Sequence, residues 1–245
     1  MSVRKVVIIP ARFHSTRLPQ KMLLPIKGKP LIYYSWKNAC NSKKADEVIV
    51  ATDHKDIFTV CKGLGANVIM TKVTHNTGTD RVGEAAKILK LRKDDVVVNV
   101  QGDEPVLPSK IIDELFKASE KESDIPMITV ATRLKDEGEV KNSNIVKVVL
   151  NKHGKALYFS RSIIPFPRSP FNTYLRHIGV YLYRASFLET LIKLRQTPLE
   201  KAESLEQLRA LENGYSIKVL IHDFLHTSVD TERDFKKVKK LLLSH

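Results

Sequence analysis

Short apolar runs alternate with segments of helical character along the first half of the chain. The run from Val96 to Val100 is continuous and β-branched, which is typical of a strand buried on both faces of a sheet. Strands that alternate with helices of this length are joined by right-handed crossovers and lie parallel. The predicted strands cover 6–9, 48–51, 67–70 and 96–100, and the predicted helices begin near Pro30, span 53–62, begin near Thr79 and span 111–118.

The pattern changes after about residue 126, where short strands follow one another with few helices between them. The segment 151–154, Asn-Lys-His-Gly, joins two of these runs and predicts a β-hairpin with glycine in its turn. We expect one α/β domain over residues 1–245, in which residues 127–184 contribute a smaller antiparallel β lobe. The later elements predicted are strands at 127–132, 145–150, 156–159 and 217–221, and helices at 185–194, at 204–213 and from Thr231.

Composition fits a globular protein, because 42% of the 245 residues are hydrophobic. No apolar run approaches the ~20 residues that span a bilayer. The apolar N-terminal stretch lacks a small-residue cleavage site, so it predicts a first strand and not a signal peptide. Cys40 and Cys61 have no metal-ligand or redox spacing. We therefore expect reduced, buried thiols in a cytoplasmic protein.

The formal net charge of +14 allows nucleic-acid binding as one interpretation. The cations are dispersed, however, and the one local cluster, at 236–240, falls on a predicted amphipathic helix, where a solvated helix face explains it. No helix-turn-helix, zinc or stacking-aromatic motif supports nucleic-acid binding. The charge also suits an enzyme with anionic substrates, and we expect neither a nucleic-acid nor a membrane partner.

The segment after the first strand is rich in groups that bind phosphate. It carries the cations Arg12, Arg17 and Lys21 with the hydroxyls of Ser15 and Thr16. No glycine-rich Walker A pattern occurs in the chain, so side chains and loop amides would have to hold a phosphate. Guanidinium and ammonium groups do this through charge-assisted hydrogen bonds. A surface loop with scattered charges is the alternative interpretation.

A carboxylate follows the most apolar strand. Gln101, Gly102 and Asp103 come directly after the run that ends at Val100. Mg²⁺ prefers one or two carboxylates together with substrate phosphates, and the carboxyl ends of parallel strands meet at one sheet edge. A simple turn is the alternative, because Gly-Asp and Glu-Pro are turn formers.

Two further segments have both a capping and a functional interpretation. Asp230, just before the last predicted helix, is a second candidate metal ligand, and either it or Thr231 could cap that helix. The segment 76–81, Asn-Thr-Gly-Thr-Asp-Arg, could contact a base and a phosphate, or simply form a capped helix start with Asp80 in its first turn.

Taken in order, these segments resemble the family of 3-deoxy-D-manno-octulosonate (KDO) cytidylyltransferases. The resemblance runs nearly end to end, and the motifs NVQGDEP, ALYFSR and LEQLR in that order are its most specific part. It implies a Rossmann-like, mostly parallel sheet of the nucleotide-diphospho-sugar transferase type with a smaller lobe. It also implies Mg²⁺ dependence, a cytoplasmic homodimer, and formation of CMP-KDO and pyrophosphate from CTP and KDO for lipopolysaccharide biosynthesis.

The resemblance also implies roles for individual residues. Arg12, Lys21, Asp103 and Asp230 would be catalytic, with Asp103 and Asp230 holding Mg²⁺. The nucleotide would contact Arg12, Ser15, Lys21, Thr77, Gly78, Arg81 and Gln101. The sugar acid would contact Arg161, Arg168, His177, Tyr181, Glu206 and Gln207. Arg209 could instead pair with Glu206 at i, i+3. The chain departs from the family pattern at Gln20 and Ser228, where glycine is frequent.

The reaction so implied is an in-line displacement, in which the anomeric hydroxyl attacks the α-phosphorus of CTP. A related acid, either a KDO variant amino-substituted at carbon 8 or a sialic acid, is an alternative acceptor. A nucleotidyltransferase with another base preference is the second alternative.

Overall fold

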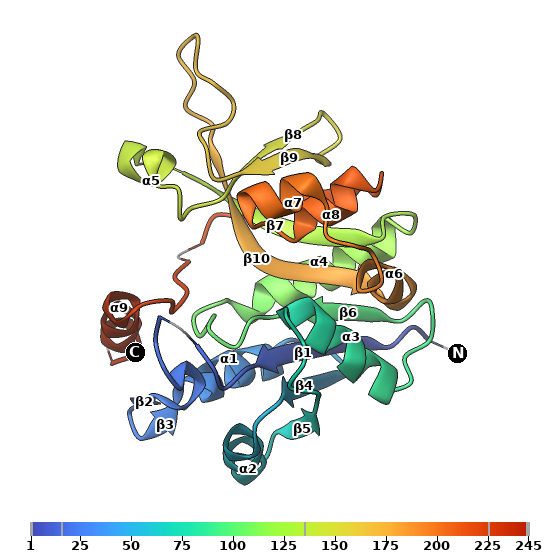
Figure 1. Ribbon diagram of the computed structural model, residues 1–245, viewed down its shortest axis with the longest axis vertical. Coiled ribbons are helices and arrows are strands. Elements are labelled where there is room, and N and C mark those ends of the chain that lie inside the picture. The colour runs from blue at the N-terminus through green and yellow to red at the C-terminus, as the bar shows by residue number, and fades with distance from the viewer. Residues whose placement is uncertain (1, 16, 135, 225, 244–245) are drawn as a thin grey trace.

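A central, mostly parallel sheet organises the molecule, and helices pack against both of its faces (Figure 1). The computed structural model describes residues 2–15, 17–134, 136–224 and 226–243. The main strand order is β11-β7-β10-β6-β1-β4-β5. Only β10 runs antiparallel to its neighbours in this order. The α/β class expected from the sequence is therefore confirmed.

The elements follow the alternation of the sequence pattern. The strands are β1 Lys5–Ala11, β2 Pro25–Ile26, β3 Lys29–Pro30, β4 Glu47–Thr52, β5 Asn67–Met70, β6 Val96–Asn99, β7 Met127–Arg133, β8 Lys147–Leu150, β9 Ala156–Ser160, β10 Leu175–Arg184 and β11 Ile217–Ile221. The helices are η1 Lys21–Leu23, α1 Leu31–Cys40, α2 Lys55–Gly63, α3 Gly78–Ile88, α4 Ser109–Lys121, α5 Glu137–Lys141, α6 Ala185–Leu191, α7 Pro198–Glu203, α8 Gln207–Glu212 and α9 Glu232–Leu243.

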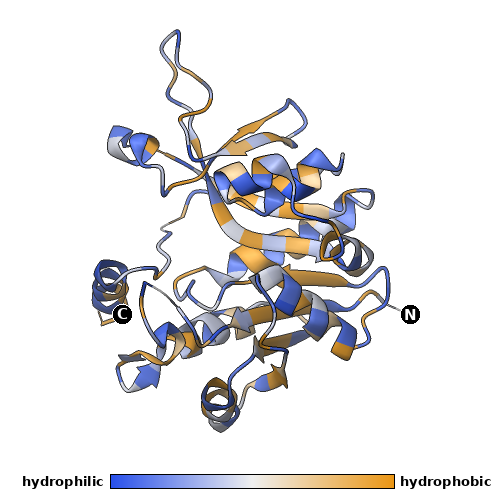
Figure 2. Cartoon of the chain, in the orientation of Figure 1, coloured by the Kyte–Doolittle hydropathy of each residue, from blue (hydrophilic) through white to orange (hydrophobic). Residues whose placement is uncertain are grey.

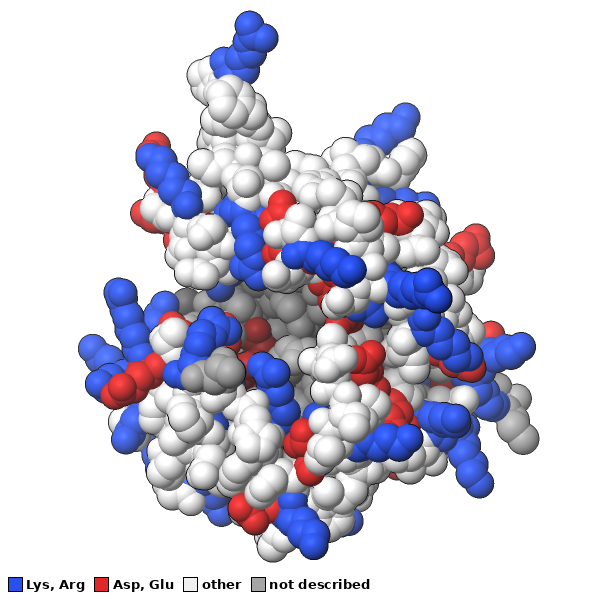
Figure 3. Space-filling view, viewed as in Figure 1, with Lys and Arg blue, Asp and Glu red and all other residues white. Residues whose placement is uncertain are grey.

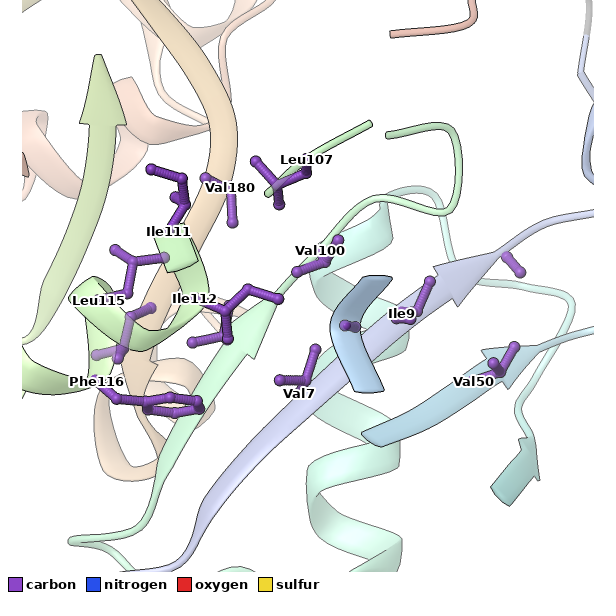
Figure 4. Packing of buried hydrophobic residues seen from close by; sticks show 14 of the residues in the cluster. Val7, Ile9, Val50, Val100, Leu107, Ile111, Ile112, Leu115, Phe116 and Val180 are labelled. Carbon is purple, nitrogen blue, oxygen red and sulfur yellow. The ribbon is translucent and has the colours of Figure 1, made fainter. Parts of the chain in front are cut away.

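The first strand contributes to the core on both faces of the sheet. Val7 and Ile9 point to the face covered by α1, α2 and α4 (Figure 4), whereas Val6 and Ile8 pack on the face covered by α3, α6 and α8. All four side chains are fully buried. Because successive strand residues alternate between faces, burial on both faces requires the continuous apolar run seen in the sequence.

The helices are amphipathic, and α4 shows why the chain folds them onto the sheet. Its residues Ile111, Ile112, Leu115 and Phe116 are buried at helical spacing, while its remaining face is polar (Figure 2). Burying each such side chain stabilises the fold by roughly 1.5–3 kcal/mol relative to exposure.

The antiparallel hairpin predicted after residue 146 is present as β8 and β9. It extends from the main sheet, to which it is joined where Lys147 of β8 pairs with Arg176 of β10. β7 and β10, at the two ends of the range 127–184, are integral strands of the main sheet. The lobe boundaries therefore stay a prediction. No strand was predicted for 175–184, which form the long strand β10.

The last helix packs beside the first loop and not on the main sheet (Figure 1). Val238 of α9 is buried with Ile26, Leu31 and Val229 in a small separate cluster. The backbone N–H of Val229 also donates to the carbonyl of Asp103 at 3.0 Å. The C-terminal segment is thereby held against the loop that follows β6.

The structure bears on two expectations, namely the burial of the two cysteines and the absence of a membrane-spanning segment. Cys61 is buried as expected, but Cys40 is exposed at the end of α1, so that part of the prediction was wrong. Within the described residues, no helix is both long and apolar enough to cross a membrane.

Candidate active site

A cavity of about 590 Å³ opens at the carboxyl ends of β1 and β6, beside the N-terminus of α3. Figure 3 shows the hollow on this face, with Lys and Arg side chains around its mouth. The cavity collects the residues to which the family resemblance gives a role in nucleotide binding. These are Arg12, Ser15, Lys21, Thr77, Gly78, Arg81 and Gln101, and Asp103 and Glu206 line the same space. Thr16, the second hydroxyl of the first loop, lies outside the described residues.

Lys21 is the centre of an ionic cluster in this cavity. Its ammonium lies 2.5 Å from Asp103 Oδ2 and 3.5 Å from Asp230 Oδ1, and its side chain is 8% exposed. Arg17, which is largely exposed, donates to the same oxygen of Asp230 at 2.9 Å. The two candidate metal ligands, 127 positions apart in the sequence, therefore converge on one point.

The Asp103 side chain is only partly buried, at 22% exposed, and this burial raises the pKa of its carboxyl, while the positive charge of Lys21 opposes the rise. Gly102 brings the backbone of this loop close to its neighbours, because a β-carbon there would lie 2.9 Å from Met22 Sδ and 3.1 Å from the carbonyl of Pro10. The side chain of Ser35 donates to the Gly102 carbonyl at 2.7 Å and fixes the loop from below.

Asp230 is free for this cluster because Thr231 caps the last helix. Thr231 Oγ1 accepts from the backbone N–H of Asp234, and the Asp234 carboxylate accepts from the backbone N–H of Thr231 at 2.9 Å. Of the two capping assignments left open by the sequence, the structure selects Thr231.

Gln20 is explained by the turn that positions Lys21. Its backbone has φ 52° and ψ 28°, the left-handed region that glycine enters without a steric penalty. Glycine is frequent at this position in the family that the chain resembles. Gln20 thus adopts a backbone conformation that suits glycine, and its β-carbon makes this conformation strained.

The start of α3 forms another wall. Thr77 caps the helix through a capping box with Asp80, so the capping interpretation of this segment is confirmed, and Thr77 and Gly78 also line the cavity. A β-carbon at Gly78 would lie 3.3 Å from Gln101 Oε1, so glycine permits close approach here. A helix N-terminus attracts anions, which suits a phosphate-binding wall. Arg81 lines the cavity, but its guanidinium already donates to Asp53 and Thr71.

A second cavity, of about 230 Å³, adjoins the first. Leu205 lines both, and two pairs of consecutive residues are divided between them. Asp103 and Glu206 face the first cavity, whereas Glu104 and Gln207 face the second. The loop after β6 and the start of α8 therefore form a shared wall.

The second cavity collects three of the six residues assigned to the sugar acid, namely His177, Tyr181 and Gln207. Tyr181 donates to Gln207 Oε1 at 3.3 Å. Burial lowers the pKa of His177 to about 3, so its imidazole is neutral, and the ring lies 3.0 Å from Thr129 Oγ1. On the other side of the wall, burial raises the pKa of Glu206, while hydrogen bonds from the hydroxyls of Thr79 and Thr77 partly offset this rise.

The two arginines assigned to the sugar acid line neither cavity. Arg161 is held by Glu203, whose carbonyl accepts from Arg161 Nε at 2.8 Å. Arg168 lies on the exposed segment between β9 and β10. The arginine that does line the second cavity is Arg176 of β10. The roles of Arg161 and Arg168 in sugar binding stay a prediction.

The pairing expected for Arg209 was wrong. Arg209 donates to both carboxylate oxygens of Glu200, at 2.8 and 2.5 Å, and both side chains are about 5% exposed. Glu200 belongs to α7, whereas Arg209 belongs to α8. This bidentate ion pair therefore ties the two short helices together.

Two acid–base side chains of the second cavity escaped sequence analysis. Glu104 was interpreted only as part of a turn, and His226 has no motif around it apart from Asp230 four residues later. Ser228, one of the departures from the family pattern, lines the same cavity. The only available signal was the position of Glu104 beside Asp103 after the most buried strand.

Among the described residues, no three His, Cys, Asp or Glu side chains gather so as to hold a metal ion alone. Asp103 and Asp230 nevertheless fit Mg²⁺, which commonly takes one or two carboxylates and completes its shell with phosphates and water. The cation already attracted to both carboxylates, Lys21, shows that this point favours positive charge.

Known proteins resemble this chain over most of its length. A family model for cytidylyltransferases matches residues 6–220. A 3-deoxy-manno-octulosonate cytidylyltransferase of Polynucleobacter necessarius subsp. necessarius (strain STIR1) is 44% identical, over 97% of this chain and 95% of its own length. The chain belongs to the 3-deoxy-manno-octulosonate cytidylyltransferase family. The resemblance drawn from the sequence motifs is confirmed.

Further members of this family agree in sequence and in fold. The Haemophilus influenzae (strain ATCC 51907 / DSM 11121 / KW20 / Rd) 3-deoxy-manno-octulosonate cytidylyltransferase is 42% identical over 98% of both chains. A solved structure of CMP:2-keto-3-deoxy-manno-octonic acid synthetase complexed with CTP superposes with a TM-score of 0.93 at 36% identity, covering 98% of this chain and 99% of that one.

Proposed function

We propose that this chain transfers the cytidylyl group of CTP to the anomeric hydroxyl of KDO and releases pyrophosphate, which activates the sugar for lipopolysaccharide biosynthesis. The observation that carries this proposal is the first cavity, where Arg12, Lys21 and Asp103 meet the start of α3 beside a second polar cavity. A nucleotide pocket with an adjoining acceptor pocket is what a group transfer between two small molecules requires.

The chain's own residues act by positioning and by charge. Arg12 and Lys21 bind the triphosphate and stabilise negative charge on the equatorial and leaving oxygens as the anomeric oxygen attacks the α-phosphorus in line. Thr77, Gly78 and Gln101 orient the nucleoside end. A β-carbon at position 78 would lie only 3.3 Å from Gln101 Oε1, and this close approach supports a narrow slot for a base.

Asp103 and Asp230 would hold Mg²⁺. When bound, the ion neutralises phosphate charge and orients the triphosphate. Binding of Mn²⁺ as a spectroscopic substitute tests this assignment without turnover. The wild type should bind Mn²⁺ with CTP more tightly than the Asp230→Asn variant does, by tenfold or more. Equal affinity would contradict the assignment.

A pyrophosphate-release assay tests the function. CTP with KDO should give turnover, while CTP alone, or KDO with ATP, GTP or UTP, should give little. The same assay with 8-amino KDO and with a sialic acid separates the alternative acceptors, because the preferred acid has the highest kcat/KM. No CTP-dependent release with any of these acids would contradict the proposal.

We also infer a cytoplasmic homodimer that uses the projecting segment around β8 and β9. Phe166 is 83% exposed there, and the apolar side chains of Ile163 and Phe171 line a surface cavity of about 660 Å³ nearby. Exposed apolar surface of this kind commonly marks a protein interface. Sedimentation should give a dimer for the wild type and a shift toward monomer for Phe166→Ser. A monomeric wild type would contradict this inference.

A further inference from the structure

The second cavity contains buried polar atoms that have no partner within the described part of the chain. They are Glu104 Oε2, Gln207 Nε2 and both ring nitrogens of His226. Each of these side chains is about nine-tenths buried or more. A buried polar group without a hydrogen bond costs roughly 1–3 kcal/mol of stability, so such groups gather where a ligand satisfies them.

Glu104 and His226 form a close pair at this wall. His226 Nε2 lies 2.8 Å from Glu104 Oε2, but neither atom makes a hydrogen bond, so the two are close without being well aligned. The pair is therefore poorly satisfied by itself. A ligand group that both donates and accepts, such as a hydroxyl, would satisfy both side chains.

We propose that Glu104 and His226 bind hydroxyl groups of the acceptor sugar and thereby set its orientation. This inference rests on the proposed function, because it needs a polyhydroxylated acid as the acceptor. It assigns these two side chains to specificity for the acceptor, in addition to His177, Tyr181 and Gln207.

The charges of the two cavities determine which end of the acceptor faces this pair. In KDO the carboxylate is attached to the anomeric carbon, so it must stay near the reacting phosphate and the cations of the first cavity. A carboxylate beside Glu104 would be repelled at close range. The hydroxylated tail, which carries no charge, therefore extends toward Glu104, His226 and the unpaired Nε2 of Gln207.

The test is steady-state kinetics of His226→Phe, which keeps an aromatic ring of similar size but removes both nitrogens. The KM for KDO should rise tenfold or more, while the KM for CTP and the half-activating Mg²⁺ concentration stay within twofold. His226→Asn, which can still form a hydrogen bond, should recover part of the loss. His153→Phe, in the exposed hairpin turn, is the matched control and should behave as the wild type.

KDO analogues that each lack one hydroxyl identify the contact. For the analogue that lacks the hydroxyl bound by His226, wild type and His226→Phe should differ by less than twofold. Glu104→Gln, which preserves the side-chain shape, should also raise the KM for KDO more than that for CTP.

Three results would overturn the inference. The first is an unchanged KM for KDO in His226→Phe. The second is an equal rise in the KM for CTP in that variant, which would reflect displacement of the segment that carries Asp230. The third is a difference between wild type and His226→Phe that stays the same for every deoxy analogue. A wild type that releases no pyrophosphate with CTP and KDO would instead contradict the proposed function. The two failures are thus distinguishable.

Discussion

The two cavities share a wall but are built in different ways. The first is assembled from turns that follow parallel strands, β1 and β6, and from the start of α3. The second depends on the antiparallel strand β10, the start of α8 and the segment before α9. The first is governed by ion pairs around Lys21, whereas the second presents a mixture of donors and acceptors. Charge therefore suits one cavity to a triphosphate, and mixed polarity suits the other to a sugar.

The largest expected effect comes from removing the carboxylate of the first cavity. Asp103→Asn keeps the side-chain shape but leaves Lys21 without its 2.5 Å partner and removes a candidate metal ligand. We expect kcat to fall on the order of 10³-fold, even at saturating Mg²⁺. Pyrophosphate release measures this loss. Asp94→Asn, at an exposed position before β6, is the control. Near-normal turnover of Asp103→Asn would show that the ionic cluster is structural only.

The next largest effect concerns α7 and α8, because the start of α8 forms part of the wall between the two cavities. Arg209→Met leaves the buried carboxylate of Glu200 without its bidentate partner. We expect a loss of about 3 kcal/mol in the free energy of unfolding by urea. Lys193→Met removes an exposed i, i+4 pair with Glu189 and should cost less than about 0.5 kcal/mol.

The same variant sharpens the contrast between the cavities. Arg209→Met should raise the KM for the sugar acid more than that for CTP, because Gln207 belongs to the acceptor cavity. If both KM values stay at the wild-type level while stability falls, the helix pair is not what positions the acceptor side.

A smaller effect follows from the neutral histidine of the second cavity. The folded pKa of His177 is about 3, below the ordinary 6.5, so the unfolded chain binds its proton first as the pH falls. The contribution of this group to stability is complete above pH 6.5 and is lost toward pH 3. Lowering the pH from 8 to 5 should therefore reduce the free energy of unfolding by about 2 kcal/mol through this group alone.

Urea unfolding at the two pH values measures this linkage. His177→Gln cannot take up a proton, so its stability should fall less between pH 8 and pH 5 than that of the wild type. His153→Gln, at an exposed turn, should retain the wild-type difference. An identical pH dependence in the wild type and His177→Gln would mean that His177 is not held neutral by burial.

The first cavity could be predicted from the sequence because its parts follow local rules. Apolar runs mark the parallel strands, and the carboxyl ends of such strands meet at one edge. Arg12, Lys21 and Asp103 therefore fell into one site once the strands were assigned. Arg12 and Asp103 lie in the turns that follow β1 and β6, and Lys21 begins the short helix η1 at the end of the first loop.

The second cavity could be predicted only in part, because its residues meet through packing between distant segments. Strand β10 runs antiparallel between β6 and β7 and brings Arg176 to the cavity. Arg161 instead donates a hydrogen bond to the carbonyl of Glu203. Spacing along α8 suggested a partner for Arg209 on its own helix, but the buried carboxylate of Glu200 is closer. Local periodicity carries no information about such contacts.

The smallest effect returns to the turn before Lys21. Gln20 adopts a left-handed conformation that costs a residue with a β-carbon roughly 1–2 kcal/mol. Gln20→Gly removes that penalty but adds about 0.4–1 kcal/mol of backbone entropy to the unfolded chain. The net gain in unfolding free energy should be about 0.5 kcal/mol by urea titration. Gln20→Ala, which keeps the β-carbon, should give no gain. A destabilised Gln20→Gly would show that the Gln20 side chain itself holds the turn, and the phosphate cavity would then depend on a contact that backbone conformation does not reveal.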